Sequence, residues 1–351
     1  MNIGPGPDQL ALRQNVRDVL AAECPPDFAR QAFADPEHWR GLWKSVVDLG
    51  WTAIAGDEFC AIDLVMVLEE CGAAIAPMPL LSSVGLAAGV LKAAGLDKTL
   101  SEIADGAVAT LAAQPAGHRL PGVPMTFADH RVRGRAISVP DLSRAEIVVI
   151  LAASADQTLA AVVKPGAGVG ITEKESIDPS RPIAELTVDA IPDATAPVDV
   201  EAALAVPLLA AAAELVGVAD TALHRAVEHA KSRVQFGKPI GAFQGVKHAL
   251  ADTYVAVQRA RSLAYAAAAR IEDPTAISSQ RWTSAALAKA AAGEAAMKST
   301  RVAVQTHGAI AQTWEHDMHL YARRAWLGEA LLGDSRTLYA AVGRRFFGGA
   351  R

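Results

Sequence analysis

The segment from Arg233 to Gly241 carries the side chains best suited to hold an anionic cofactor. It lies between two long stretches of helical periodicity, so Arg233 falls at a helix end. A guanidinium fixed there can make two parallel hydrogen bonds to a diphosphate, which the ammonium of a lysine cannot. Gly237 and Gly241 allow a tight reversal and a close approach of the backbone. From spacing alone, an ordinary helix–helix turn with a solvated arginine is the simpler explanation.

Carboxylates and histidines elsewhere indicate chemistry less clearly. Glu214 lies in an apolar, alanine-rich stretch, where a buried or capping role explains it more simply than a role as base. His316 and His319 are spaced to share one helix face and could bind a metal. A polar helix start explains the same stretch, because Glu315 is favourable near the positive end of a helix dipole. We predict no metal site and leave open whether Glu214 or another acid acts as a base.

Composition and charge limit the class of protein. The chain has 351 residues, of which 51% are hydrophobic, so a large core is possible and global disorder is excluded. Its 33 Lys and Arg residues against 38 Asp and Glu residues give a net charge of −5, and no basic stripe is visible. We therefore expect no nucleic-acid partner. The length predicts two or three packed units.

Cysteine usage and hydropathy argue for a cytoplasmic protein that does not enter a membrane. The three cysteines are far apart and form no C-x-x-C pair, which disfavours a disulfide scaffold or a structural zinc site. Met1–Asp8 has neither a charged nor an apolar leader region, so no secretory signal is expected. The most apolar stretch, 202–219, contains Pro207 and Glu214 and predicts a buried helix instead of a membrane span.

The elements that must position these residues form three regions. Helical periodicity covers residues 1–105, short apolar runs between turn residues predict a small antiparallel β domain over 106–198, and helical periodicity returns over 199–351. The last region predicts a four-helix bundle, with alanines that allow close approach of the helix axes. The four helices are expected at 208–231, 242–271, 281–306 and 315–332. The fold class is thus mainly α with a central β-barrel or sandwich domain.

The motif Arg-x-Gln-Phe-Gly-Lys-Pro-Ile-x-x-Phe-Gln, which begins at Arg233, resembles that of the acyl-CoA dehydrogenase family. Further segments resemble the family in the same order, so the resemblance covers nearly the whole chain. These segments are 42–51, 67–72, 178–181 and 305–311. In addition, 314–317 and the basic pair Arg323–Arg324 resemble one flavin-dependent branch of the family. The resemblance implies the same three-part fold.

The resemblance also implies an activity and a cofactor. Members of the family bind FAD and desaturate acyl-CoA thioesters between the α and β carbons. A glutamate removes the α-proton, and the β-hydrogen leaves as hydride to the flavin. The FAD lies across a subunit interface, with its flavin ring in one subunit and its diphosphate and adenine half clamped by the neighbour.

Residues of the clamp carry over well. Arg233, Gln235 and Phe236 match the family's clamp on the diphosphate. Gln305 and Gly308 match the turn on the adenine side, where Ala309 and Ala311 replace two glycines. The resemblance therefore implies that these residues bind FAD.

Residues around the flavin ring and the base depart from the family. Ser138–Pro140 replaces the family's Trp-Ile-Thr, and a proline has no N–H to donate to a flavin carbonyl. Gln114–Gly117 replaces a Glu-Pro-Gly loop, and the loop at 56–59 lacks the usual Gly-Gly. The two family positions for the glutamate hold Leu332 and Pro207, which cannot accept a proton. We therefore assign no catalytic residue.

Three hypotheses follow. In the first, this chain is the non-catalytic subunit of a heteromeric, α2β2 acyl-CoA dehydrogenase and shares FAD with a homologous partner that carries the glutamate and binds most of the acyl-CoA. Such assemblies resemble bacterial enzymes of steroid breakdown, which favours a steroid-derived substrate and an electron-transfer flavoprotein as acceptor. In the second, the chain is a self-sufficient homo-oligomer with an unrecognised base. In the third, it is a flavin-free binding or scaffold protein.

Overall fold

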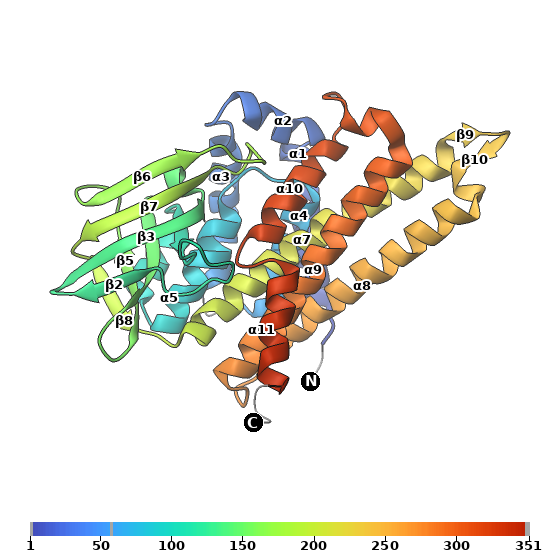
Figure 1. Ribbon diagram of the computed structural model, residues 1–351. Helices are drawn as coiled ribbons and strands as arrows, with labels where there is room; N and C mark the ends of the chain where they lie inside the picture. Colours follow the sequence, from blue (N-terminus) through green and yellow to red (C-terminus); the bar gives the residue numbers. More distant parts are fainter. Residues whose placement is uncertain (1–2, 57–58, 348–351) are drawn as a thin grey trace.

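The computed structural model describes residues 3–56 and 59–347. Helices come first along the chain, a sheet packs beside them, and long helices form a bundle on the other side (Figure 1). The loop predicted at 56–59 includes residues 57–58, and the leader-free start predicted at Met1–Asp8 includes residues 1–2. Both predictions therefore lie partly outside the described residues.

The N-terminal part is helical, as predicted. Pro7 and Pro26 begin two of its helices, at the position where a missing N–H costs nothing. Gly50 and Gly95 follow two others in the left-handed conformation, with φ of 75° and 66°. The elements are α1 (Pro7–Glu23), α2 (Pro26–Ala34), α3 (Trp39–Asp48), η1 (Trp51–Ala55), α4 (Ala61–Ala73), η2 (Leu81–Ala87), α5 (Ala88–Ala94) and α6 (Asp97–Ala104).

The middle part is one eight-stranded sheet in the order β6-β7-β3-β2-β4-β5-β8, with β1 added beside β4. Its strands are β1 (Ala109–Ala112), β2 (Met125–Ala128), β3 (Arg131–Pro140), β4 (Ile147–Ala153), β5 (Thr158–Val163), β6 (Val169–Lys174), β7 (Ile183–Ala190) and β8 (Ala194–Pro197). The prediction of a wholly antiparallel domain is wrong at two pairings, because β4 runs parallel to both β1 and β2. Parallel neighbours need a longer crossover connection, which the local turn signals did not reveal.

The C-terminal part is the predicted helical bundle, but with one helix more than expected. It comprises α7 (Val200–Ser232), the hairpin strands β9 (Val234–Gln235) and β10 (Lys238–Pro239), η4 (Ile240–Ala242), α8 (Gln244–Glu272), α9 (Ser278–His307), η5 (Gly308–Gln312), α10 (Met318–Ala330) and α11 (Ser335–Phe347). The fourth predicted helix ends at Ala330, and α11 follows a break at residues 331–334. The three-part division at 105 and 198 stays a prediction.

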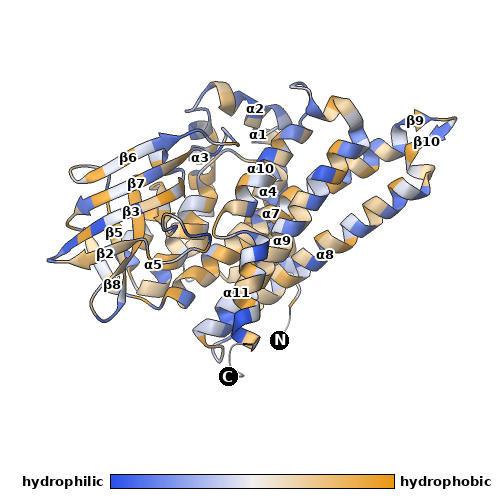
Figure 2. Ribbon diagram, viewed as in Figure 1, coloured by the Kyte–Doolittle hydropathy of each residue, from blue (hydrophilic) through white to orange (hydrophobic). Residues whose placement is uncertain are grey.

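Helix α7 is the centre of the molecule. An apolar window within it is long enough to cross a membrane, but 89% of that window is buried inside the protein. Gly217 and Gly72 let α7 and α4 touch, because a methyl group on either would lie within about 2.0 Å of a backbone oxygen on the other helix. Figure 2 shows α5 and the adjoining part of α7 largely in hydrophobic colours, whereas hydrophilic segments recur along α8.

Candidate functional site

A pocket of about 410 Å³ lies between the sheet and the bundle. It collects segments far apart in the sequence that include Gln114, Ser138, Pro140 and Leu332, all of which the sequence comparison placed around a flavin ring or a base. Pro207 does not line this pocket. It is buried inside α7, where its ring packs against Gly89 of α5. We refer to this space as the central pocket.

A β-bulge forms one wall of the central pocket. The pairing of β3 with β7 shifts between Ala136 and Val139, and Ser138 adopts a positive φ of 52°. Bulges of this kind often lie next to functional sites. Two polar groups here are already engaged, because the N–H of Ile137 donates to the Gln114 carbonyl and the Pro140 carbonyl accepts from Thr110. The exposed side chain of Ser138 is a donor that this wall still offers to a ring.

Leu332 also lines the central pocket and is 5% exposed. Its φ of 56° is unusual for a bulky residue, so the loop must be held by its surroundings. Lys289 supplies that hold. It is fully buried on α9, and its Nζ donates to the carbonyls of Glu329 and Gly333 at 3.2 Å each. Burial lowers the pKa of Lys289 to about 8, against the opposing effect of Glu329.

Asp334 is the one carboxylate among the described residues that line the central pocket. It caps α11, because its Oδ1 accepts from the N–H of Thr337 at 2.8 Å. Its Oδ2 lies 3.3 Å from Nη1 of Arg119. Burial acts to raise the pKa of Asp334, but the Thr337 hydrogen bonds and Arg119 outweigh it and hold this pKa below its usual value. Asp334 is thus a structural cap and a weak base.

An ionic cluster lies behind the pocket wall, where residues of the middle part meet α7 and α10 of the bundle. Arg181, which lines the pocket, donates two hydrogen bonds to Glu214 of α7, one of them at 2.7 Å. Arg324 of α10 donates to Asp178 at 2.5 Å and to Ser180 at 2.9 Å. All five residues are at most 2% exposed. We call this set the buried ionic cluster.

Electrostatics of the buried ionic cluster keep its acids charged. Burial acts to raise the pKa of Glu214 and Asp178, but Arg181 and Arg324 outweigh burial, so both values are lowered. Glu214 is therefore an ionised structural acid with both oxygens engaged. This agrees with the buried role predicted for it and argues against a role as base.

The hairpin β9–β10 carries the predicted diphosphate clamp and projects from the end of α7 and α8 farthest from the sheet (Figure 1). Phe236 and Gly237 form its tip with φ of 52° and 76°, the geometry of a two-residue hairpin turn that normally excludes a phenylalanine. Phe236 is 91% exposed. Among the described residues, no hydrogen bond or ion pair engages the side chain of Arg233, which is also exposed.

The predicted adenine-side residues lie at the same end of the bundle. Gln305 is exposed near the end of α9, and Gly308 ends that helix with a positive φ of 74° and open space around its Cα. Ala309 is exposed in η5, so its methyl group does not fill a buried turn. The structure thus brings together both predicted clamp segments, which are 72 positions apart from Arg233 to Gln305.

Histidines join these two segments. The rings of His229 on α7 and His307 on α9 lie 4.3 Å apart, and His307 lies 4.8 Å from His316. His229 precedes Arg233 by one helical turn, and its carbonyl accepts from the N–H of Arg233 at 2.8 Å. Sequence reasoning missed this cluster, because the three histidines belong to separate segments. His319 points elsewhere and stacks on Trp314.

Metal binding finds no support among the described residues. No group of three or more His, Cys, Asp or Glu side chains within them could hold a metal ion. The pair His316 and His319 is divided between two sets of contacts, because the Nδ1 of His316 accepts from Met318 and the Nε2 of His319 faces the Trp314 carbonyl at 3.4 Å.

Gln305 also lines a second pocket, of about 650 Å³, between α9 and α10. Arg301 and Arg323 line it as well, and none of its described lining residues is a carboxylate. Trp326, which is 47% exposed, supplies an aromatic face. The chemistry of this lining suits a ligand that combines anionic groups with a planar ring. We call it the arginine pocket.

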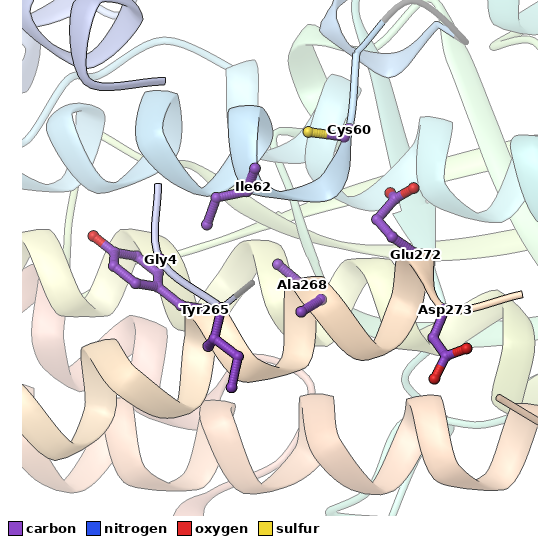
Figure 3. Close-up of a pocket in the computed structure, with 9 residues that line it drawn as sticks. Gly4, Cys60, Ile62, Tyr265, Ala268, Glu272 and Asp273 are labelled. Carbon is purple, nitrogen blue, oxygen red and sulfur yellow. The ribbon is translucent and has the colours of Figure 1, made fainter. Parts of the chain in front are cut away.

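A third pocket, of about 500 Å³, lies between α8 and the start of α4 and includes an acid that stabilises the fold. Figure 3 shows Tyr265, Ala268 and Glu272 of α8 on one side and Cys60 and Ile62 at the start of α4 on the other. Glu272 accepts from the N–H of Ala61 at 2.9 Å and so caps α4. The acid is therefore engaged, and the pocket contains none of the residues singled out by the sequence.

Comparisons with known proteins agree with this geometry. Residues 200–347 match the family model described as acyl-CoA dehydrogenase, C-terminal domain. The chain is 33% identical over 345 residues to acyl-CoA dehydrogenase IpdE2 of Mycobacterium tuberculosis, with 95% of each chain covered. It is 34% identical over 344 residues to IpdE2 of Mycolicibacterium smegmatis, covering 93% of this chain and 94% of the relative.

Solved structures extend the likeness to the whole fold. The ChsE4–ChsE5 complex from Mycobacterium tuberculosis matches with a TM-score of 0.88 at 26% identity over 99% of both chains. A variant of the Tcur3481–Tcur3483 steroid ACAD has the same fold, with a TM-score of 0.88 at 24% identity over 98% of both chains. With the same three-part fold and a relative 33% identical across 95% of its residues, the chain belongs to the acyl-CoA dehydrogenase family.

Proposed function

We propose that this chain is the non-catalytic subunit of a heteromeric acyl-CoA dehydrogenase and grips the nucleotide half of an FAD whose flavin ring lies in a homologous partner. The observation that supports a cofactor shared between subunits is the distance between the two half-sites. Arg233 follows Glu214 by 19 residues of α7, which at 1.5 Å per residue separates the hairpin from the wall of the central pocket by about 28 Å. A nucleotide gripped by the hairpin therefore serves another chain.

The donor chemistry supports FAD at the hairpin end. Arg233 offers a fork of donors for a diphosphate, Phe236 an exposed ring, and the arginine pocket beside Gln305 an aromatic face with cationic groups. The central pocket offers a flavin fewer backbone donors than the family's strand end, since the N–H of Ile137 is engaged and Pro140 lacks an N–H. FAD bound at the shared site supplies the acceptor for the hydride, and this chain's residues only hold and orient it.

Loss of the base supports the same assignment. Leu332 lines the central pocket where the family carries a glutamate, and Pro207 is buried against α5. Neither side chain can accept a proton. The partner would contribute the glutamate and bind most of the acyl-CoA, and an α2β2 assembly would contain two such pairs. An electron-transfer flavoprotein as acceptor and a cytoplasmic location complete the proposal.

The substrate class follows from the names of relatives only. The Tcur3481–Tcur3483 match is described as a steroid ACAD, and the ChsE4–ChsE5 match is a complex of two named subunits. We infer that the assembly acts on a steroid-derived acyl-CoA. The solved complex favours the heteromeric hypothesis over the scaffold hypothesis.

A self-sufficient enzyme is the second candidate, since a carboxylate, Asp334, and an imidazole, His118, line the central pocket. Asp334 is committed to the α11 cap, and His118 is exposed at the rim. In this case the isolated chain would retain flavin and turn over acyl-CoA, and Asp334→Asn or His118→Gln would abolish turnover.

Co-expression tests the proposal. The chain is produced alone and together with a homologous chain that has glutamate at the position of Leu332, and flavin absorbance and acyl-CoA desaturation are measured after gel filtration. We expect little flavin and no turnover alone, and about one FAD per unlike pair with turnover in the complex. Stoichiometric flavin and turnover in the isolated chain would establish the second candidate instead.

A further inference from the structure

The three-histidine row at the hairpin end of the bundle has no role in the proposed site so far. His229, His307 and His316 come from α7, from the end of α9 and from the segment before α10. The first two rings are tilted by 30° at a centroid distance of 4.3 Å, which is close enough for direct packing. Each of them lies within one helical turn of a clamp segment.

Hydrogen bonds fix the position of one proton on His307 and indicate that His316 is uncharged. The Nδ1 of His307 lies 2.8 Å from the Ala303 carbonyl, and a carbonyl only accepts, so this nitrogen carries a proton. The Nδ1 of His316 accepts from the N–H of Met318 at 3.1 Å and therefore carries none. A second proton on His316 would break its bond to the first residue of α10.

The acids nearest the row are already paired with cations, and the effect of Asp317 on His316 is outweighed by burial and His307. Asp317 is held by Arg30 of α2 at 2.6 Å and by Arg225 of α7 at 2.8 Å. Glu228 is held by Lys231 at 2.7 Å on the same turn of α7. Arg233 adds a further cation next to His229. Burial, His307 and Arg233 lower the pKa of His229, and burial and His307 lower that of His316.

The contact between His229 and His307 lies between the two clamp segments. Arg233 is attached to the turn of His229 by the backbone hydrogen bond described above, and Gly308 follows His307 directly. The two rings thus bridge the end of α7 and the end of α9, where the clamp segments begin. A change in the spacing of the two rings would move the diphosphate residue relative to the adenine-side turn.

We propose that His229 and His307 are positioning residues whose packed rings hold the two FAD-binding segments in register, and that a proton added to His229 in acid separates the rings and weakens the grip on FAD. The inference rests on the proposed function. It assigns the histidines no contact with FAD. The cost of burying a charged His229, together with its repulsion from Arg233, supplies the force that opens the clamp.

FAD retention by the co-expressed complex tests this. The complex is desalted rapidly at pH values from 8.0 to 5.0, and bound flavin is measured by absorbance. We expect wild-type retention to fall in the acidic half of this range, with affinity weakening by at most about tenfold per pH unit for each proton taken up. His229→Phe keeps a ring in contact with His307 but cannot titrate, so its retention should stay within a few-fold of its pH 8.0 value throughout.

Two further variants separate positioning from other roles. His229→Ala removes the packed ring and should weaken retention at every pH. His224→Gln removes an exposed histidine of α7 and should behave as wild type. An acid loss that persists in His229→Phe would overturn the proposal, as would retention that increases in acid, because histidines that contact the phosphates directly would bind more tightly when charged. A wild-type complex without flavin at pH 8.0 would instead contradict the proposed function itself.

Discussion

Replacing Glu214 by glutamine is expected to destabilise the fold without acting on the chemistry. The glutamate is 2% exposed, and it accepts two hydrogen bonds from Arg181 and lies 3.4 Å from Nη1 of Arg324. An amide retains one acceptor but turns an NH₂ group toward a guanidinium. The substitution therefore leaves buried positive charge without its partner.

The size of the effect follows from burial. Removing one member of a buried ion pair costs about 3–5 kcal/mol. Asp178 and Asp141 remain near the two arginines and offset part of the loss, so we expect the lower end, about 3 kcal/mol. With a denaturant dependence near the upper end of about 1–3 kcal/mol per molar urea, the unfolding midpoint should fall by roughly 1 M.

Urea unfolding of the isolated chain, followed by far-ultraviolet circular dichroism, measures this shift. Glu294→Gln is the matched control, because Glu294 meets Arg259 at 2.6 Å at a position where both side chains are about half exposed. Such a pair contributes about 0–1 kcal/mol, so the control midpoint should barely move. An unchanged midpoint for Glu214→Gln, together with loss of turnover in the complex, would refute the structural role and make Glu214 a reacting group.

The stability that the buried ionic cluster contributes should also depend on pH. The pKa values of Glu214 and Asp178 are lower in the folded chain than their ordinary values. The unfolded chain therefore binds more protons in acid, and stability from these groups is present above about pH 4.5 and is lost as the pH falls through the folded values. The difference in unfolding free energy between wild type and Glu214→Gln should therefore become smaller as the pH falls below about 4.5.

Other predictions concern the pocket loop and the helix crossing. The pKa of Lys289 is lowered to about 8 from 10.5, so the unfolded chain binds more protons between these pH values. The wild type should therefore gain up to about 3 kcal/mol of unfolding free energy as the pH rises from 8 to 10.5. Urea titrations at each pH should show that Lys289→Met lacks this gain. Gly217→Ala should yield little soluble protein, since its methyl would lie 1.8 Å from the Glu69 carbonyl oxygen, whereas Gly343→Ala, which meets nothing within 4 Å, should express normally. Leu332→Glu should not confer turnover on the isolated chain, because a base without a flavin cannot complete the desaturation; measurable activity would contradict this.

Much of the architecture was predictable, because helical periodicity and strand punctuation are local signals. At the hairpin end of the bundle, α7 and α9 end, and α8 begins, within two residues of the expected positions. Helix α11 was missed because its start depends on the cap by Asp334, and the preceding break depends on Lys289, which lies more than 40 positions earlier. In the sequence, a lysine in the middle of an alanine-rich helix was the signal that could have indicated this contact.

Site prediction shows the same division. The clamp residues were predicted from two short motifs, and the structure places both segments at one end of the bundle, while their role as a clamp stays a prediction. The buried ionic cluster could be anticipated only in part: Asp178–Arg181 and the Arg323–Arg324 pair were singled out by resemblance, but not their convergence on Glu214. Side chains from three separate segments meet there, and single-sequence periodicity carries no information on such long-range pairs.

The most direct test of the account is the FAD content of the co-expressed complex when Arg233 of this chain alone is changed. Loss of hydrogen bonds to a charged group costs about 1.5–3 kcal/mol, so Arg233→Ala should weaken FAD binding by roughly 10- to 150-fold, and Arg233→Lys should recover only part of it. Lys231→Ala, which removes an exposed charge two residues away, should retain FAD as the wild type does. Added FAD should restore turnover, because the partner's glutamate is untouched. Unchanged flavin content in Arg233→Ala would mean that Arg233 is a solvated turn residue, and it would contradict the shared cofactor site.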